Sequence, residues 1–129
     1  MMDFLTIAKQ RCSILSYTEK KVEPEKLEKM LEAAHVAPTA ANLQPIHLIV
    51  IQSEEGLAKI GKACNIYGAP LAIIVCADHG KAWVRPFDKK QTGDIDASIL
   101  TDHMMLQASP TRHDQTRIPV SQLFSYETL

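Results

Sequence analysis

The stretch AAHVAPTAANLQPIHLIVIQ, residues 33–52, joins three kinds of local sequence. A run of small, helix-forming residues ends before Pro38, which cannot continue a helix. A polar, turn-forming segment follows as far as Pro45, and an apolar run rich in isoleucine begins immediately after it. The pattern predicts a helix, a polar loop and a strand, and a loop held between rigid elements often carries function.

The flanking sequence adds further helices and a second strand. Leu27, Met30, Leu31 and Ala34 have the spacing of one helix face. A helical segment joins the two apolar runs, and this order predicts a parallel crossover, with the first strand covered on both faces. The predicted helices are 3–12, 23–37, 54–63 and 94–108, and the predicted strands are 46–52 and 71–77. We therefore expect an α+β fold with a small sheet flanked by helices.

Length and composition exclude several classes of protein. The 129 residues suit one domain, and a net charge of −1 gives no basic field for nucleic acid. The apolar runs are far shorter than the roughly 20 residues of a membrane helix, and the N-terminus lacks the pattern of a signal peptide. A cytoplasmic protein with no membrane or nucleic-acid partner is expected. Cys12, Cys64 and Cys76 form no C-x-x-C pair, so neither a disulfide framework nor a zinc site is expected.

Two short motifs carry groups suited to ligand binding. Arg11 and Ser13 are two residues apart in RCSILSY, so extended backbone would point both toward one oxyanion. The alternative is a surface arginine at a helix end. In the loop, Asn42 and Gln44 each offer a donor and an acceptor, which suits the edge of a heterocycle. The alternative is that both amides satisfy backbone groups of their own loop.

Together these motifs resemble the nitroreductase family of flavin enzymes. The resemblance rests on R-x-S near the N-terminus and on A-P-[ST]-x-x-N-x-Q-P before an apolar strand. YGAPLAIIVCAD and DIDASILTDHMMLQA resemble later parts of the family, so the resemblance covers residues 3–108. It implies a nitroreductase-like fold and an intertwined homodimer. It also implies FMN at the subunit interface and NAD(P)H as the hydride donor.

The resemblance assigns residues of both motifs to the flavin site. Arg11 and Ser13 match positions that contact the flavin phosphate and ribityl chain, and Cys12 lies where the family often has a second arginine. Leu15 stands where a basic residue is common, which puts one phosphate contact in doubt. The loop contributes the segment that packs near the flavin and two amide positions. These loop residues are Pro38, Thr39, Ala40, Asn42 and Gln44.

Residues 109–129 match nothing in the family. After the 94–108 helix, the family continues with a glycine-rich G-L-G segment and a tryptophan. It later supplies backbone donors near the flavin N5 and basic residues for the phosphate. None of these follows residue 108 here. We therefore expect a truncated, incomplete flavin-binding domain over 1–108 and an atypical tail over 109–129 that reflects a truncation or a frameshift.

The 94–108 helix is expected to form the homodimer interface. This helix is apolar around much of its surface, so it must be buried, either in a core or between subunits. Its large apolar residues are Ile95, Ile99, Leu100, Met104, Met105 and Leu106. Two strands also supply less edge pairing than a stable sheet needs, so we expect either that a second chain completes the sheet or that part of the protein is absent.

Other polar residues are assigned structural roles. His47 lies in an apolar strand and is expected to be a core histidine with its hydrogen bonds satisfied. Asp94 and Asp96 are expected to cap the 94–108 helix. No metal site is expected, because the remaining acidic and histidine residues match no known ligand spacing. These residues are Asp78, His79, Asp102 and His103.

Two functions remain open on the sequence. In the first, the chain is an FMN-dependent oxidoreductase that passes hydride from NAD(P)H through the flavin to a nitroaromatic, quinone or similar acceptor. No nucleophile–base set is present, which fits chemistry supplied by a cofactor. In the second, the chain is a non-catalytic remnant that dimerises but binds flavin weakly or not at all.

Overall fold

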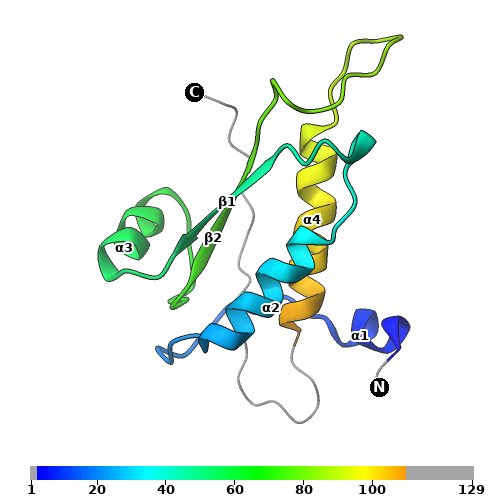
Figure 1. Ribbon diagram of the computed structural model, residues 1–129. Helices are drawn as coiled ribbons and strands as arrows, with labels where there is room; N and C mark the ends of the chain where they lie inside the picture. The colour runs from blue at the N-terminus through cyan, green and yellow to red at the C-terminus, as the bar shows by residue number, and fades with distance from the viewer. Residues whose placement is uncertain (1–2, 110–129) are drawn as a thin grey trace.

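The structure, a computed structural model, describes residues 3–109. Its elements in chain order are α1 (Phe4–Gln10), α2 (Pro24–His35), the 3₁₀ turn η1 (Ala40–Asn42), β1 (Ile46–Ile51), α3 (Glu54–Ala63), β2 (Ala72–Ala77) and α4 (Gly93–Ala108). The strands β1 and β2 form a two-stranded sheet. Figure 1 shows α2 crossing α4 beside this sheet, with α1 and α3 at opposite sides. The expected α+β arrangement of a small sheet and flanking helices is confirmed. The tail predicted over 109–129 lies outside the described residues except for Ser109, the C-cap residue of α4.

The second helix, α2, begins and packs as its sequence predicts. Pro24 occupies the first turn, where its missing N–H removes no helical hydrogen bond. The helix ends at His35. The apolar face predicted from the residue spacing packs on the core, and its residues Met30 and Ala34 are buried.

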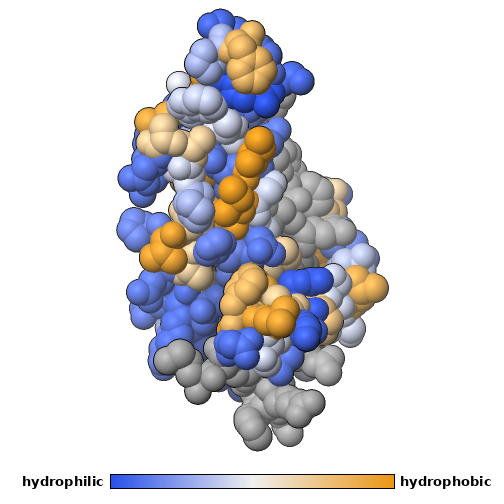
Figure 2. Space-filling view, turned by 90° about the vertical axis from the view of Figure 1, so that its right-hand side faces the viewer, coloured by the Kyte–Doolittle hydropathy of each residue, from blue (hydrophilic) through white to orange (hydrophobic). Residues whose placement is uncertain are grey.

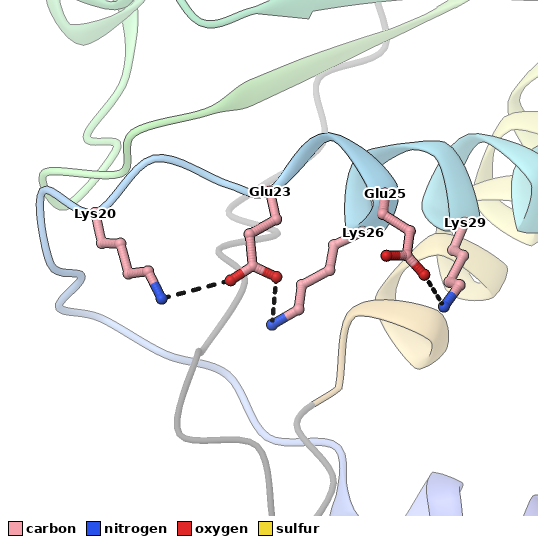
Figure 3. A network of polar contacts seen from close by, with 5 residues as sticks. All are labelled: Lys20, Glu23, Glu25, Lys26 and Lys29. Carbon is pink, nitrogen blue, oxygen red and sulfur yellow. Dashed lines mark hydrogen bonds and ion pairs between the residues drawn. The ribbon is translucent and has the colours of Figure 1, made fainter.

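A small network of ion pairs lies at the start of α2 (Figure 3). Lys29 lies 3.0 Å from Glu25, one helical turn away, and its hydrogen bond lowers the pKa of Glu25. Glu23 pairs with both Lys20 and Lys26, each at 3.5 Å. Most of these side chains are well exposed, so each pair contributes little to stability. The buried face of α2, rather than this network, therefore fixes the position of the helix.

The two strands run antiparallel, so the predicted parallel crossover is wrong. The register pairs Ile46 with Ala77 at one end and Ile51 with Ala72 at the other. A parallel connection normally needs a helix packed on a face of the sheet, and α3 has no buried residue. In Figure 1, α3 lies beyond the ends of the strands rather than over either face. It therefore belongs to the long connection of a hairpin.

Only one face of β1 is well covered within residues 3–109, although both faces were expected to be. Ile46 and Leu48 pack against the buried core. The alternate residues His47 and Ile49 are exposed, and half of the surface of Ile49 is accessible. This alternation is typical of an antiparallel strand with one solvated face. The prediction that His47 is a core histidine is therefore wrong.

The core lies between α2, α4 and the inner face of the sheet. Full burial of a leucine, valine or methionine contributes roughly 1.5–3 kcal/mol relative to exposure, whereas the alanines mainly allow close approach of the helices. The buried members of this cluster are Ala34, Ala37, Val75, Ala97, Leu100 and Met104.

The first turn of α4 differs from the prediction. The N-cap residue is Thr92, so neither Asp94 nor Asp96 caps the helix. Asp94 is exposed, and its carboxylate lies 3.4 Å from the His79 ring. Asp96 is buried, because it lies four residues before Leu100 on the inner face of the helix.

No helix within residues 3–109 is long and apolar enough to cross a membrane. In the same part of the chain, no group of three or more His, Cys, Asp or Glu side chains is placed to hold a metal ion. All three cysteines are free.

Replacing Met104 by alanine should lower the free energy of unfolding by about 2–5 kcal/mol, because the side chain is 1% exposed and its loss leaves a cavity. Urea denaturation followed by circular dichroism measures this change. Gln107→Ala, on the exposed side of the same helix, is the matched control and should change stability by less than about 0.5 kcal/mol. Equal losses for the two variants would contradict the packing of α4 described above.

Candidate functional site

The loop between α2 and β1 has an unusual backbone. Ala41, Asn42 and Gln44 all have positive φ, at 52°, 53° and 50°. Residues with a side chain adopt this left-handed conformation rarely, at a cost of roughly 1–2 kcal/mol each, and asparagine tolerates it best. The surrounding structure must therefore hold the loop in this shape. Backbone strain of this kind gathers at binding and catalytic sites.

Groups other than the two amide side chains satisfy the backbone of the loop. The Thr39 carbonyl accepts from the Asn42 N–H at 2.9 Å, and the Thr39 hydroxyl accepts from the Gln44 N–H at 3.0 Å. The Ala40 N–H donates to Asp96 Oδ1 at 2.9 Å. The loop is therefore tied both to itself and to the first turn of α4.

The side chains of Asn42 and Gln44 are consequently available to a ligand. Both residues are exposed, and neither side chain forms a hydrogen bond with another group in residues 3–109. The alternative, in which these amides satisfy the backbone of their own loop, is wrong for this structure. Each amide keeps a free donor and a free acceptor, as the edge of a heterocycle requires.

The N-terminal motif lies at an exposed helix end. Asp3 caps α1 by accepting from the Thr6 N–H at 2.9 Å, and this bond is the largest cause of the lowered pKa of Asp3. Arg11 is the C-cap residue, with extended backbone, and its N–H donates to the Ile7 carbonyl at 3.1 Å. The predicted site residues of this segment are all exposed: Arg11, Cys12, Ser13 and Leu15.

The two motifs lie near opposite ends of α4 within one chain. The Ala40–Asp96 hydrogen bond holds the loop to the first turn of α4, and Figure 1 shows α1 level with the far end of that helix. With 16 residues, α4 is about 24 Å long. One chain therefore does not bring the Arg11–Ser13 motif next to the amide side chains of the loop.

A pocket of about 290 Å³ opens beside the loop. Its volume is close to the lower end of the range for small-molecule sites, and its walls expose polar and apolar surface in similar amounts. Gln44 and Thr39 belong both to this lining and to the predicted flavin site. Sequence reasoning did not find the pocket, because its walls come from separate segments. The lining residues are Leu31, Ala34, His35, Ala37, Thr39, Gln44, Ile46, Leu48 and Leu100.

Asp96 is the polar residue at this site whose role the sequence analysis missed. It was assigned to helix capping because acids are frequent near helix starts. The signal that identifies it is its spacing: Asp96, Leu100 and Met104 follow one another at intervals of four, which places an acid on the buried face.

Comparison with known proteins identifies the family. Residues 8–66 match the model of the nitroreductase family. The chain contains part of a nitroreductase-family domain. A crystal structure of a nitroreductase family protein from Clostridium difficile 630 is 60% identical to the segment, with a TM-score of 0.82, and the match covers 84% of this chain and 63% of that one. The nitroreductase-like fold expected from the sequence is therefore confirmed.

Two further relatives carry functional names. An FMN-dependent nitroreductase from Clostridium difficile R20291 matches this nitroreductase segment with a TM-score of 0.68 and 32% identity, covering 82% of this chain and 60% of that one. A protein of Archaeoglobus fulgidus, named provisionally as an NADH dehydrogenase/NAD(P)H nitroreductase, is 36% identical over 112 residues, which are 84% of this chain and 62% of that protein. The segment thus spans about 60% of the length of these relatives.

Replacing Ala41 by glycine should raise the free energy of unfolding by up to about 1 kcal/mol, because glycine adopts the observed φ of 52° without strain. Ala58→Gly, at an exposed position of α3, is the control and should lower stability by about 1 kcal/mol. Thermal denaturation of both variants measures the two changes. The same sign for both would show that the loop does not hold Ala41 in a left-handed conformation.

Proposed function

We propose that this nitroreductase segment binds FMN and takes part in an NAD(P)H-dependent reduction of a nitroaromatic, quinone or similar small-molecule acceptor. The observation that carries the proposal is the strained loop, which leaves the amides of Asn42 and Gln44 exposed and without partners in residues 3–109. The names of the relatives support it, since one is an FMN-dependent nitroreductase and another, from Bacillus subtilis, an NAD(P)H-dependent FMN reductase.

The residues present fit such a cofactor. Bound FMN would supply the redox chemistry itself. The loop amides would orient the ring by hydrogen bonds to its polar edge, and the small side chains of Thr39 and Ala40 would permit close approach of the backbone. Arg11 would hold the phosphate through its planar fork of donors, with Ser13 adding a hydroxyl. The missing basic residue at Leu15 would leave this phosphate site with less charge.

A homodimer would complete this site. Because one chain keeps the Arg11–Ser13 motif and the loop near opposite ends of α4, both can hold one FMN only if a second copy supplies one of them. Apolar groups interrupt the polar surface on the side of the molecule that Figure 2 faces. Phe4 and Leu5 of α1 and Ile95 of α4 are among the exposed large hydrophobic residues, and burial of such residues would favour association through these helices.

A second candidate function is a non-catalytic protein that dimerises but holds flavin weakly or not at all. The observation that favours it is Leu15, which stands where the resemblance places a basic residue for the flavin phosphate.

Titration of the purified chain with FMN, followed by quenching of flavin fluorescence, separates the two candidates. We expect saturable binding with one flavin per chain, together with a dimer in sedimentation at micromolar concentration. Addition of NADH or NADPH without oxygen should then bleach the flavin absorbance. A dimer without flavin binding would favour the second candidate, and a well-folded monomer would rule out the shared site.

Arg11→Ala should weaken FMN binding by about 1.5–3 kcal/mol, which is the scale of a charge-assisted hydrogen bond. Riboflavin lacks the phosphate and should bind the variant and the parent chain alike. Lys9→Ala, which removes an exposed charge from the last turn of α1, is the control and should leave both affinities nearly unchanged. Equal losses for FMN and riboflavin would mean that Arg11 acts through folding rather than through the phosphate.

A further inference from the structure

We infer that Asp96 is a positioning residue whose carboxylate sets the conformation of the candidate flavin loop. Its Oδ1 accepts from the backbone N–H of Ala40, a residue 56 positions earlier in the chain, at 2.9 Å. Ala40 opens the 3₁₀ turn that contains the left-handed Ala41 and Asn42. The bond therefore joins the strained part of the loop to the rigid helix beneath it.

The burial of this carboxylate indicates a specific role. Asp96 is 2% exposed, and a buried acid is costly unless its oxygens find donors. Its second oxygen accepts from the Thr92 hydroxyl at 3.2 Å. The residue also lies in the first turn of α4, where the helix dipole favours negative charge. An apolar residue would pack at this position without those requirements, so the core of α4 alone does not explain an aspartate.

The same network reaches the connection between β2 and α4. The Thr92 hydroxyl, which bonds Asp96, also lies 3.3 Å from the Trp83 carbonyl, and the Thr92 N–H donates to that carbonyl at 2.9 Å. Beyond Trp83, Val84 and Gln91 form an antiparallel bridge. Asp96 thus lies between the loop that follows α2 and the connection between β2 and α4, two segments that are far apart in sequence. Its hydrogen bonds fix the position of one relative to the other.

The effect of Asp96 on flavin binding rests on the proposed function, whereas its effect on the loop does not. The carboxylate bonds the backbone of the loop rather than the amides that would meet the flavin, so it would act through Ala40 and Thr39. Loss of the bond would free the loop to leave its left-handed conformation, which costs energy to maintain. The amides of Asn42 and Gln44 would then lose their fixed positions.

Amide hydrogen exchange of the full chain tests the effect on the loop directly. Asp96→Ala should speed exchange at Ala40, Asn42 and Gln44 by about tenfold or more, the scale of one lost buried hydrogen bond. Amides at the centre of α4 should change by less than about twofold. Asp96→Asn keeps an acceptor for the Ala40 N–H and should stay within about threefold of the parent. Asp94→Ala removes the exposed neighbouring acid and should leave loop exchange unchanged.

A second variant removes the donor instead of the acceptor. Ala40→Pro deletes the N–H, and the extended backbone of Thr39, at φ −128° and ψ 156°, already suits a residue before proline. It should speed exchange at Asn42 and Gln44 as Asp96→Ala does. Adding Asp96→Ala to it should give little further change, because both substitutions break the same bond.

Flavin affinity supplies a second measurement on the same variants. Asp96→Ala should raise the Kd of both FMN and riboflavin by about tenfold, because the loop would contact the ring rather than the phosphate, and Asp96→Asn should restore most of the affinity. Unchanged loop exchange in Asp96→Ala, equal acceleration across the whole chain, or an Asp96→Asn variant as impaired as Asp96→Ala would overturn the inference. A parent chain that binds no flavin would refute the proposed function instead, and the exchange data would still decide the role of Asp96.

Discussion

The packing of α2 against α4 is the constraint on which the rest of the described structure depends. Ala34 of α2 and Ala97 of α4 have small side chains in the shared core, which lets the two helices approach closely, while Leu100 and Met104 fill the space around them. Because α2 ends beside α4, the chain that leaves α2 must pass over the first turn of α4 before β1 begins. The position of the loop is therefore a consequence of helix packing, and the loop residues only determine its detailed shape.

The conformation of the loop lowers its own stability but leaves two polar side chains available to a ligand. A relaxed turn would let Asn42 and Gln44 bond their own backbone, as short polar side chains commonly do. Instead the hydroxyl of Thr39 and the carboxylate of Asp96 take over those bonds, and three residues accept a left-handed backbone. Natural sequences depart from local preferences mainly at functional sites, and the loop shows such a departure in both its dihedral angles and its hydrogen bonds.

Features set by neighbouring residues could be predicted from the sequence, whereas features set by distant contacts could not. The helix predicted over 23–37 follows from local spacing, and α2 (Pro24–His35) confirms it. The direction of the second strand depends on where α3 packs, and nothing in its own sequence specifies that. The sequence identified Asn42 and Gln44 as candidate ligand-binding amides. It could not predict that one chain keeps them far from Arg11, because that separation depends on the length and placement of α4. Asp96 was misassigned because an acid near a helix start serves as a cap far more often than as a buried anchor.

The position of α3 also bears on how this part of the chain can vary in length. The antiparallel register brings Ile51 and Ala72 face to face, so the ends joined by the α3 connection are already adjacent. No residue of α3 is buried, and the entropy of closing a loop changes only slowly with its length. Insertions and deletions within α3, away from the buried Ala69 and Leu71 that precede β2, would therefore disturb neither the helix pair nor the loop above α4. It is the natural place in this domain for related chains to differ in size, or for a foreign segment to be grafted.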